Sequence, residues 1–287
     1  MPIDPTAAVG AALPAREATW TSSDVLLYHL ALGAGGDPVS PGELRYAYES
    51  DLHVLPTFAV VAPSLRETAP PSLDLPGIDI DLRKVLHGGQ EVVLHRPLPT
   101  DAKAVAQTTI ADVYDKGKAA VIVQETALTS QDGEPLATMR SQVFVRGEGG
   151  FGGDRGPSDR VELPDRAPDA ELLTHTLPQQ ALWYRLCGDR NPLHVDPGFA
   201  AAAGFDRPIL HGLCTYGMVC KAVVDGVLDG DVAAVAGFRV RFAGVVIPGE
   251  TLRTRVWRED GQLLLTTGVV ERDDAPALAD GVLTVAG

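Results

Sequence analysis

The stretch YRLCGDRNPLHVDPGFAAAAGFDRPILHGLCTYG, residues 184–217, decides the interpretation of this chain. Within six residues it carries a carboxylate, an amide and an imidazole, those of Asp189, Asn191 and His194, and Asn191 is the only asparagine in the chain. Pro192 keeps the segment out of a helix and biases the preceding residue toward an extended backbone. On such a loop these side chains can converge on one water, where an acid and a base share its proton transfers.

The end of the stretch predicts a second part of the same site. After His211-Gly212 the chain is apolar to about residue 228, and only a thin polar strip interrupts it, so we predict a buried helix. The N–H of Gly212 at its start can donate to a carbonyl oxygen that gains negative charge, and glycine lets a ligand approach. Acid, base and donor together suit proton chemistry beside a thioester carbonyl, such as water addition to an α,β-double bond.

Between these two parts, Asp196 precedes Pro197 and Gly204 follows shortly after, which predicts an N-cap and a short helix. A metal set of His194, His211 and Asp196 is the alternative, but its spacing fits no standard zinc pattern. The segment lacks the G-x-S-x-G elbow of a serine hydrolase. Cys187 and Cys214 have apolar neighbours and are interpreted as packing residues.

Outward from this stretch, turn signals divide the chain into two similar halves. We predict strands in the second half at 236–246, 251–258, 262–271 and 281–286, and in the first half at 91–98, 103–114, 119–128 and 135–145. Before the first-half strands we further expect an extended arm over 1–17, a helix over 22–32 and a strand over 43–49. A helix is expected over 57–62, where a strand fits almost as well, and a loop over 63–80. In the second half we expect a short helix over 178–186. Each half then forms a sheet wrapped around one helix, and the two halves can continue into a single sheet.

The predicted boundaries are 1–146 for the first half, 147–169 for a linker and 170–287 for the second half. The run GEGGFGG at 147–153 matches the dinucleotide pattern G-x-G-x-x-G, but Asp154-Arg155-Gly156-Pro157 follows it. No helix can start cleanly there to hold a pyrophosphate. A linker is therefore the better interpretation.

Composition excludes several classes of protein. The 287 residues are 45% hydrophobic with a formal net charge of −14, which argues against a nucleic-acid or acidic-membrane surface. Three cysteines give no disulfide framework and fit a reducing cytosol. The first residues have no signal-peptide pattern, and no apolar run reaches the ~18 residues of a membrane span. We expect a cytoplasmic protein.

The motifs Y-R-L-C-G-D-R-N-P-L-H-V-D-P and G-F-D-R-P-I-L-H-G-L-C-T-Y-G resemble the signature of the MaoC-like (R)-specific enoyl-CoA hydratases, or hydratase 2. Pieces of the first half resemble the two-repeat form of that family, as in peroxisomal multifunctional enzyme type 2. They include Leu86-His87-Gly88, Asp115-Lys116-Gly117 and Gly150-Phe151-Gly152-Gly153. Two positions depart from the family pattern: Gly89 stands where an acid is expected, and Cys187 where serine is expected.

The resemblance implies an α+β double hot-dog fold and reversible syn hydration of trans-2-enoyl-CoA to (R)-3-hydroxyacyl-CoA. It implies a catalytic pair Asp189 and His194, with Asn191 beside them and Gly212 N–H as oxyanion donor. The substrate- and CoA-binding candidates are His87, Gly88, Lys116, Arg190, His211 and Phe242. Without the resemblance, Lys116 is a solvated turn lysine.

It also implies an acyl-CoA substrate, no metal, no cofactor apart from the substrate's coenzyme A, and a homodimer. Three alternatives use the same fold. The first is a 3-hydroxyacyl-ACP dehydratase, the second a non-catalytic acyl-thioester-binding subunit, and the third a thioesterase.

Overall fold

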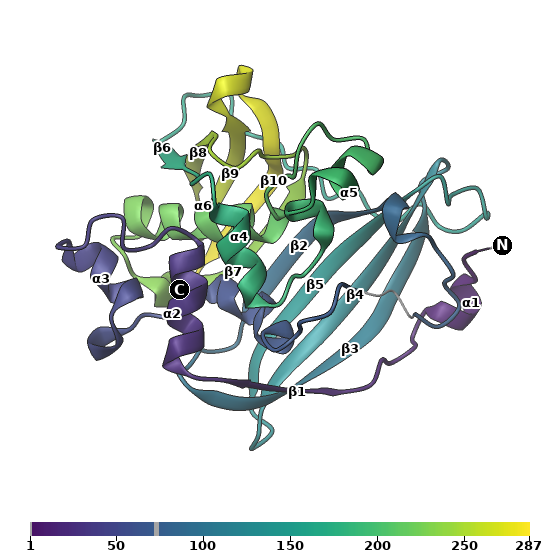
Figure 1. The fold of residues 1–287 in the computed structure, drawn as a ribbon, viewed down its shortest axis with the longest axis horizontal. Coiled ribbons are helices and arrows are strands. Elements are labelled where there is room, and N and C mark those ends of the chain that lie inside the picture. The colour runs from purple at the N-terminus through teal and green to yellow at the C-terminus, as the bar shows by residue number, and fades with distance from the viewer. Residues whose placement is uncertain (1, 72–74) are drawn as a thin grey trace.

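The computed structural model describes residues 2–71 and 75–287, and its described strands form one antiparallel sheet in the order β1-β3-β4-β5-β2-β7-β10-β9-β8-β6 (Figure 1). The strands are β1 (Arg16–Trp20), β2 (Val85–Leu94), β3 (Ala102–Asp115), β4 (Ala119–Ser130), β5 (Pro135–Arg146), β6 (Ala170–His175), β7 (Val235–Phe242), β8 (Thr251–Glu259), β9 (Gln262–Val269) and β10 (Ala275–Val285).

The strand order shows the internal repeat. From the centre outward, the first half runs β2-β5-β4-β3-β1 and the second half runs β7-β10-β9-β8-β6. The halves join where β2 pairs with β7, from Gly89 opposite Arg241 to Val93 opposite Gly237. The prediction that both halves continue into a single sheet is confirmed.

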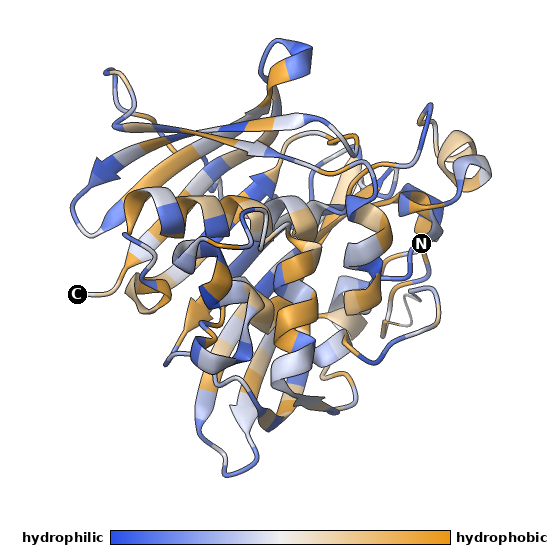
Figure 2. Ribbon diagram, turned by 60° about the vertical axis from the view of Figure 1, so that its left-hand side comes forward, coloured by the Kyte–Doolittle hydropathy of each residue, from blue (hydrophilic) through white to orange (hydrophobic). Residues whose placement is uncertain are grey.

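The helices are α1 (Pro5–Ala8), α2 (Ser22–Ala31), α3 (Pro41–Ala47), α4 (Gln180–Tyr184), α5 (Pro197–Ala202) and α6 (Gly212–Val227), and α6 is the predicted buried helix. Figure 2 shows helices layered against one side of the sheet. Helix α2 packs closely on α6 because Gly217 has no side chain. A Cβ there would lie 2.7 Å from the Tyr28 hydroxyl and 2.8 Å from Leu32.

Three predictions in the first half need correction. Residues 43–49 are not a strand, because Pro41 at the first position starts helix α3, and the alternation reflects only the burial of Tyr46. The predicted helix over 57–62 is a 3₁₀ turn, η2 (Pro56–Val60), which packs against β2 and α6. The first half therefore wraps around a short turn rather than a long helix. In the predicted loop 63–80, residues 72–74 lie outside the described part of the chain.

Strand ends were less predictable than strand cores. β1 begins at the end of the predicted arm. Neither β1 nor β6 was predicted, because each is a short outermost strand of the sheet with a weak pattern. β2 begins before residue 91 and β10 before residue 281, and both contain a register shift near a glycine, at His87/Gly89 and at Ala279/Val282. Glycine at a bulge interrupts the apolar alternation from which these strands were predicted.

No helix in the described residues is long and apolar enough to cross a membrane. The segment after residue 150 contains no helix until α4 and passes from the first half to the second, where the Trp257 indole donates to the Arg166 carbonyl at 3.0 Å. The linker boundaries 147–169 stay a prediction.

Candidate active site

The loop that carries Asp189 is shaped by a glycine. A 3₁₀ turn, η5 (Arg185–Cys187), ends at Gly188, whose φ of +106° is in the left-handed region. A Cβ at this position would lie 2.0 Å from the Ser64 carbonyl oxygen. Only glycine lets the loop pass so close to the backbone of the first half.

Asn191 fixes the loop from within. Its backbone N–H donates to Asp189 Oδ1 at 3.1 Å, and its Oδ1 accepts from the Leu193 N–H at 3.0 Å. The second contact caps a 3₁₀ turn, η6 (Pro192–His194). Asn191, predicted beside the acid–base pair, thus holds the Asp189 carboxylate and the turn before His194 in place.

His194 has its protonation pattern set by the backbone. Its Nδ1 lies 2.8 Å from the Ile209 carbonyl oxygen, so Nδ1 carries the hydrogen and Nε2 keeps a lone pair. Burial lowers the pKa of this imidazole, which is 9% exposed, and the nearby Asp189 charge opposes the shift. A neutral imidazole with a free Nε2 is a general base.

His211 stacks on His194, with ring centroids 3.7 Å apart, and its Nε2 lies 3.4 Å from the Asp189 carbonyl oxygen. Burial, and then the adjacent His194, lower the pKa of His211. Its side chain is fully buried and does not line the cleft described below, and it contacts the His194 ring and the Asp189 backbone.

Asp189, His194 and His211 place possible ligand atoms within 4.8 Å of one another. A metal ion must lie near the plane of each imidazole that binds it, and two stacked rings inclined by 28° do not direct their nitrogens at one point. Asp196, the third residue of the alternative metal site, is not part of this cluster and caps a helix instead. Its Oδ1 accepts from the N–H groups of Gly198 and Phe199, so the predicted N-cap of α5 is confirmed.

Gly212 connects this cluster to the surface of the sheet. It is the first residue of α6, where the N–H has no partner within the helix. A Cβ on Gly212 would lie 3.0 Å from the Phe242 ring, and Phe242 in turn packs on His87 at 4.7 Å between ring centroids. Burial lowers the pKa of His87 to about 4 against the opposing charge of Asp189. His87 from β2 and Phe242 from β7 therefore bring both halves to the site.

A cleft of about 930 Å³ opens beyond His87 and Phe242. It is lined from both halves by β2, β4, β5, β7 and β10, by the end of β3 with the β3–β4 turn, and by residues 157–160. His87, Gly88, Lys116 and Phe242, four of the predicted binding residues, all line it. Arg190 does not; its guanidinium lies 3.4 Å from the Glu67 carbonyl oxygen instead.

The cleft is locally basic although the chain is acidic. Five basic side chains and three acidic ones line it, namely Lys116, Arg140, Arg160, Arg239 and Arg241 against Glu91, Asp159 and Asp280. Such a surplus of cations suits the phosphates of a nucleotide-bearing ligand.

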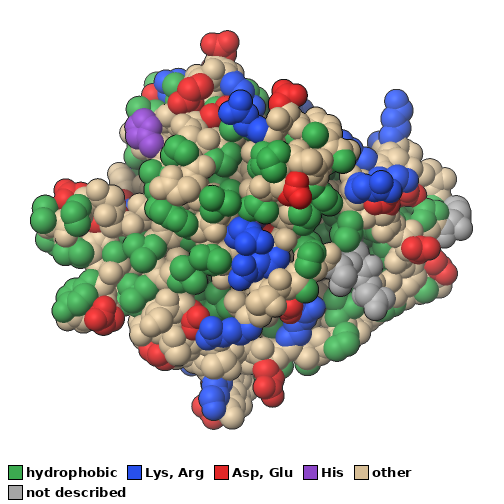
Figure 3. All heavy atoms as spheres, in the orientation of Figure 1, with side chains coloured by type: hydrophobic (Ala, Val, Ile, Leu, Met, Phe, Trp, Pro, Cys, Tyr) green, Lys and Arg blue, Asp and Glu red, His purple; other side chains and the backbone are tan. Residues whose placement is uncertain are grey.

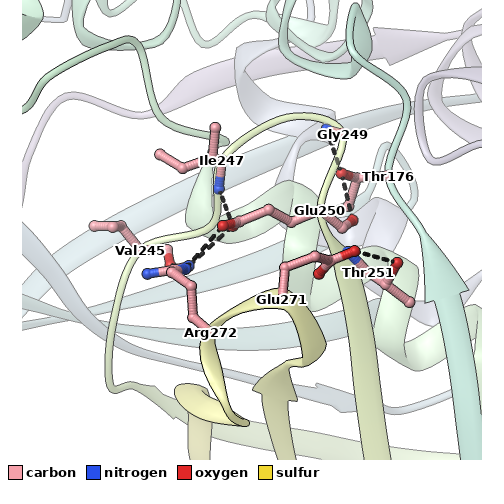
Figure 4. Close-up of polar contacts among 8 residues, drawn as sticks. All are labelled: Thr176, Val245, Ile247, Gly249, Glu250, Thr251, Glu271 and Arg272. Atoms are coloured by element: carbon pink, nitrogen blue, oxygen red, sulfur yellow. Dashed lines mark hydrogen bonds and ion pairs between the residues drawn. The ribbon is translucent and has the colours of Figure 1, made fainter.

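A second loop supports the catalytic segment. The Val246 carbonyl accepts from the Leu210 N–H at 2.7 Å, directly before His211. Figure 4 shows how this loop is held: Glu250 accepts from the Ile247 N–H and pairs with Arg272, which also donates to the Val245 carbonyl. The position of Gly212 thus depends on an ion pair at the end of the sheet.

Comparison with known proteins agrees with this geometry. Residues 19–147 match the family model of the MFE-2 hydratase 2 N-terminal domain, and residues 159–276 that of the MaoC like domain. The enoyl-CoA hydratase ChsH3 of Mycobacterium tuberculosis is 56% identical over 97% of this chain and 98% of its own length. The peroxisomal enoyl-CoA hydratase 2 of Arabidopsis thaliana is 42% identical, with 91% of this chain and 89% of that protein covered.

The chain belongs to the MaoC-like enoyl-CoA hydratase 2 family. A MaoC-like dehydratase structure from Phytophthora capsici superposes with a TM-score of 0.89 at 32% identity, covering 99% of this chain and 98% of the other. The predicted α+β double hot-dog fold is confirmed.

The arginines of the cleft have no signal in the sequence of this hydratase 2 family member that marks them as binding residues. Arg140 lies on β5, and Arg239 and Arg241 lie on β7, where these two alternate with apolar neighbours. That alternation marks them as facing away from the core. Which exposed arginines meet one another depends on the pairing of β2 with β7, and no local pattern encodes this pairing.

Proposed function

We propose that the protein is an (R)-specific 2-enoyl-CoA hydratase, which adds water reversibly and syn to trans-2-enoyl-CoA. The observation that carries the proposal is the neutral His194 with a free Nε2 beside the Asp189 carboxylate, whose charge also acts on His87 in the lining of a basic cleft. Relatives named as enoyl-CoA hydratases, similar along nearly the whole chain, support the same activity.

In the forward reaction, His194 Nε2 accepts a proton from water while the water oxygen bonds to C3 of the enoyl thioester. The π electrons move through C2 to the thioester carbonyl, and the Gly212 N–H stabilises the resulting negative charge on oxygen. The proton that His194 has taken from water passes to C2 by way of the Asp189 carboxylate, so both side chains return to their starting states. The roles of Asp189 and His194 can be exchanged without changing the net reaction. Both groups lie on one loop and act from one face of the double bond, which makes the addition syn.

The test is turnover of trans-2-enoyl-CoA substrates of increasing chain length, with the configuration of the 3-hydroxyacyl product determined by chiral chromatography. We expect the (R) product. We propose that no metal or cofactor is needed beyond the substrate's coenzyme A, so dialysis against EDTA should leave the rate unchanged. An (S) product, or no hydration at any chain length, would rule the proposal out.

A carrier-bound substrate is the second candidate. A relative that is 41% identical over 99% of this chain is named a 3-hydroxyacyl-thioester dehydratase, a name that does not specify the carrier. The basic cleft favours coenzyme A, because its nucleotide part carries a pyrophosphate and a 3′-phosphate, whereas the phosphopantetheine arm of a carrier protein carries a single phosphodiester. Comparing kcat/KM for the same acyl group on coenzyme A and on acyl carrier protein decides between them.

We also propose that the protein is a cytoplasmic homodimer. Support for dimerisation comes from Leu182, Trp183 and Leu186, large apolar side chains that are 39–53% exposed on and after α4. Figure 3 shows hydrophobic side chains spread among charged ones on the face where α4 lies. Light scattering with size-exclusion chromatography measures the mass, and a monomer at micromolar concentration would contradict the dimer.

A further inference from the structure

The glycine-rich segment 147–153 binds an anion, and that anion belongs to the chain itself. Asp115, the last residue of β3, is 6% exposed. Its Oδ1 accepts from the N–H groups of Gly117 at 2.7 Å and Gly150 at 2.8 Å, and its Oδ2 from Gly152 at 2.7 Å. The glycine amides that resemble a phosphate cradle in the sequence are thus used by the Asp115 carboxylate.

Glycine is required for this arrangement. Gly150 and Gly152 have φ values of +84° and +81°, which favour glycine. A Cβ on Gly149 would lie 2.6 Å from the backbone nitrogen and oxygen of Ala119. The segment 147–153 therefore packs tightly against the β3–β4 turn, and the Asp115 carboxylate is hydrogen-bonded to both.

This junction sets the mouth of the cleft. Lys116, which lines the cleft, directly follows Asp115, and its amine donates to the Arg155 carbonyl. The Asp115 N–H donates to the Asp154 carbonyl at 2.7 Å, which fixes the start of the chain that leads to the lining residues 157–160. Asp115 itself is not part of the lining.

We propose that Asp115 is a positioning residue for substrate binding, which holds Lys116 and residues 157–160 where the nucleotide part of the thioester binds. The inference rests on the proposed function, because it assumes a coenzyme A ligand in the cleft. The N–H groups, that of Gly150 first, lower the pKa of Asp115, so the carboxylate stays ionised at neutral pH. The role is distinct from catalysis, since the carboxylate touches no reacting atom.

The experiment compares Asp115→Asn with the intact protein, using crotonyl-CoA and crotonyl-N-acetylcysteamine, which lacks the nucleotide. An asparagine amide has one acceptor oxygen and turns an NH₂ group toward a glycine N–H, so the clamp weakens. We expect KM for crotonyl-CoA to rise about tenfold. We expect kcat, and all constants for the truncated thioester, to stay within about twofold. Calorimetry with free coenzyme A should show a matching rise in Kd, a readout that needs no turnover.

Asp231→Asn is the matched control, because Asp231 also accepts a backbone N–H, that of Ala233, but lies outside the cleft lining. Gly152→Ala is the second variant: its Cβ meets open space, and the strain at positive φ displaces one donor, so the same selective rise in KM should appear at smaller size. Equal losses on both thioesters, or an unchanged Kd and KM for the coenzyme A ligands, would overturn the positioning role. If the intact protein binds coenzyme A but hydrates neither thioester, the proposed function fails, while the Kd comparison still decides the role of Asp115.

Discussion

Asp189 and His194 owe their placement to hydrogen bonds with backbone groups of neighbouring residues. The carboxylate is oriented by the Asn191 N–H, and the imidazole by the Ile209 carbonyl. Both contacts come from backbone atoms, those of the same loop and those of the segment directly before α6. Substituting either reacting group therefore changes its chemistry without removing the support around it.

Asp189→Asn and His194→Gln should each lower kcat for enoyl-CoA hydration by about 10²–10⁴-fold, the usual contribution of a general acid or base. Asparagine cannot exchange the proton, and a glutamine amide cannot accept one from water. Steady-state rates measure the effect, and circular dichroism with thermal unfolding checks that the variants remain folded.

Asp196→Asn is the control within the same loop region, since asparagine caps a helix as well as aspartate does. Its rate should match that of the unchanged protein. Full activity in either Asp189→Asn or His194→Gln would show that the proton transfers occur elsewhere.

Asp189 and His194 could be predicted to lie together because only four residues of one loop separate them. The cleft residues were predictable only in part. Lys116 and His87 came from family resemblance, whereas Arg140 and Arg239 join them only through the register of separate strands. Contacts of that kind depend on the tertiary structure, and a single sequence does not contain a local signal for them.

At the scale of elements, His29 ties three segments of the first half together. It lies on α2 and is fully buried; its Nδ1–H donates to the Tyr46 carbonyl at the end of α3, and its Nε2 accepts from the Leu55 N–H. Both contacts require the neutral ring, because a protonated Nε2 would face another N–H. Burial lowers the pKa of His29 to about 4.

The free energy of unfolding should therefore fall as pH is lowered from about 6.5 toward 4. In this window the unfolded chain binds a proton at His29 and the folded chain does not, so protons favour unfolding. The full shift is worth about 3 kcal/mol, lost progressively across the window. Urea unfolding at a series of pH values measures it.

His87, His194 and His211 have lowered pKa values as well and act in the same direction, so His29→Gln isolates the contribution. This variant should be less stable at pH 7 but lose less stability on acidification. Parallel pH curves for the two proteins would contradict the assignment to His29.

Elements bounded by strong turn chemistry were predicted well, and those bounded by tertiary contacts were not. Asp132-Gly133 and Asp260-Gly261 separate strands where they were expected, since such turns are encoded locally. Residues 43–49 alternate like a strand but form α3, where Tyr46 is buried and donates to Asp225 of α6. The contact of Tyr46 with Asp225, which is distant in sequence, outweighed the strand-like alternation of residues 43–49.

At the scale of the whole molecule, the two halves share one site unequally. The second half supplies Asp189, His194 and Gly212, while the first half supplies His87 and Lys116. The two halves also share one hydrophobic core, because η2 of the first half packs on α6 of the second. The repeat thus explains the fold, and the difference between its copies explains why the catalytic loop occurs once.

Cutting the chain between Glu162 and Leu163, both exposed, tests this dependence. The Asp115 clamp stays with the first piece and the Arg166–Trp257 contact with the second. Each piece alone exposes β2 or β7 as an unpaired strand and uncovers apolar core, so we expect both to aggregate and to hydrate no enoyl-CoA. Co-expressed, they should pair through β2 and β7 and recover activity. That activity should fall on dilution, because the covalent link no longer holds the halves at high local concentration.

Co-purification through a tag on one piece and a hydration assay measure whether the two pieces pair and recover activity. If residues 163–287 alone were soluble and as active as the intact chain, the first half would be unnecessary for the site, and the contribution of His87 and Lys116 would be refuted.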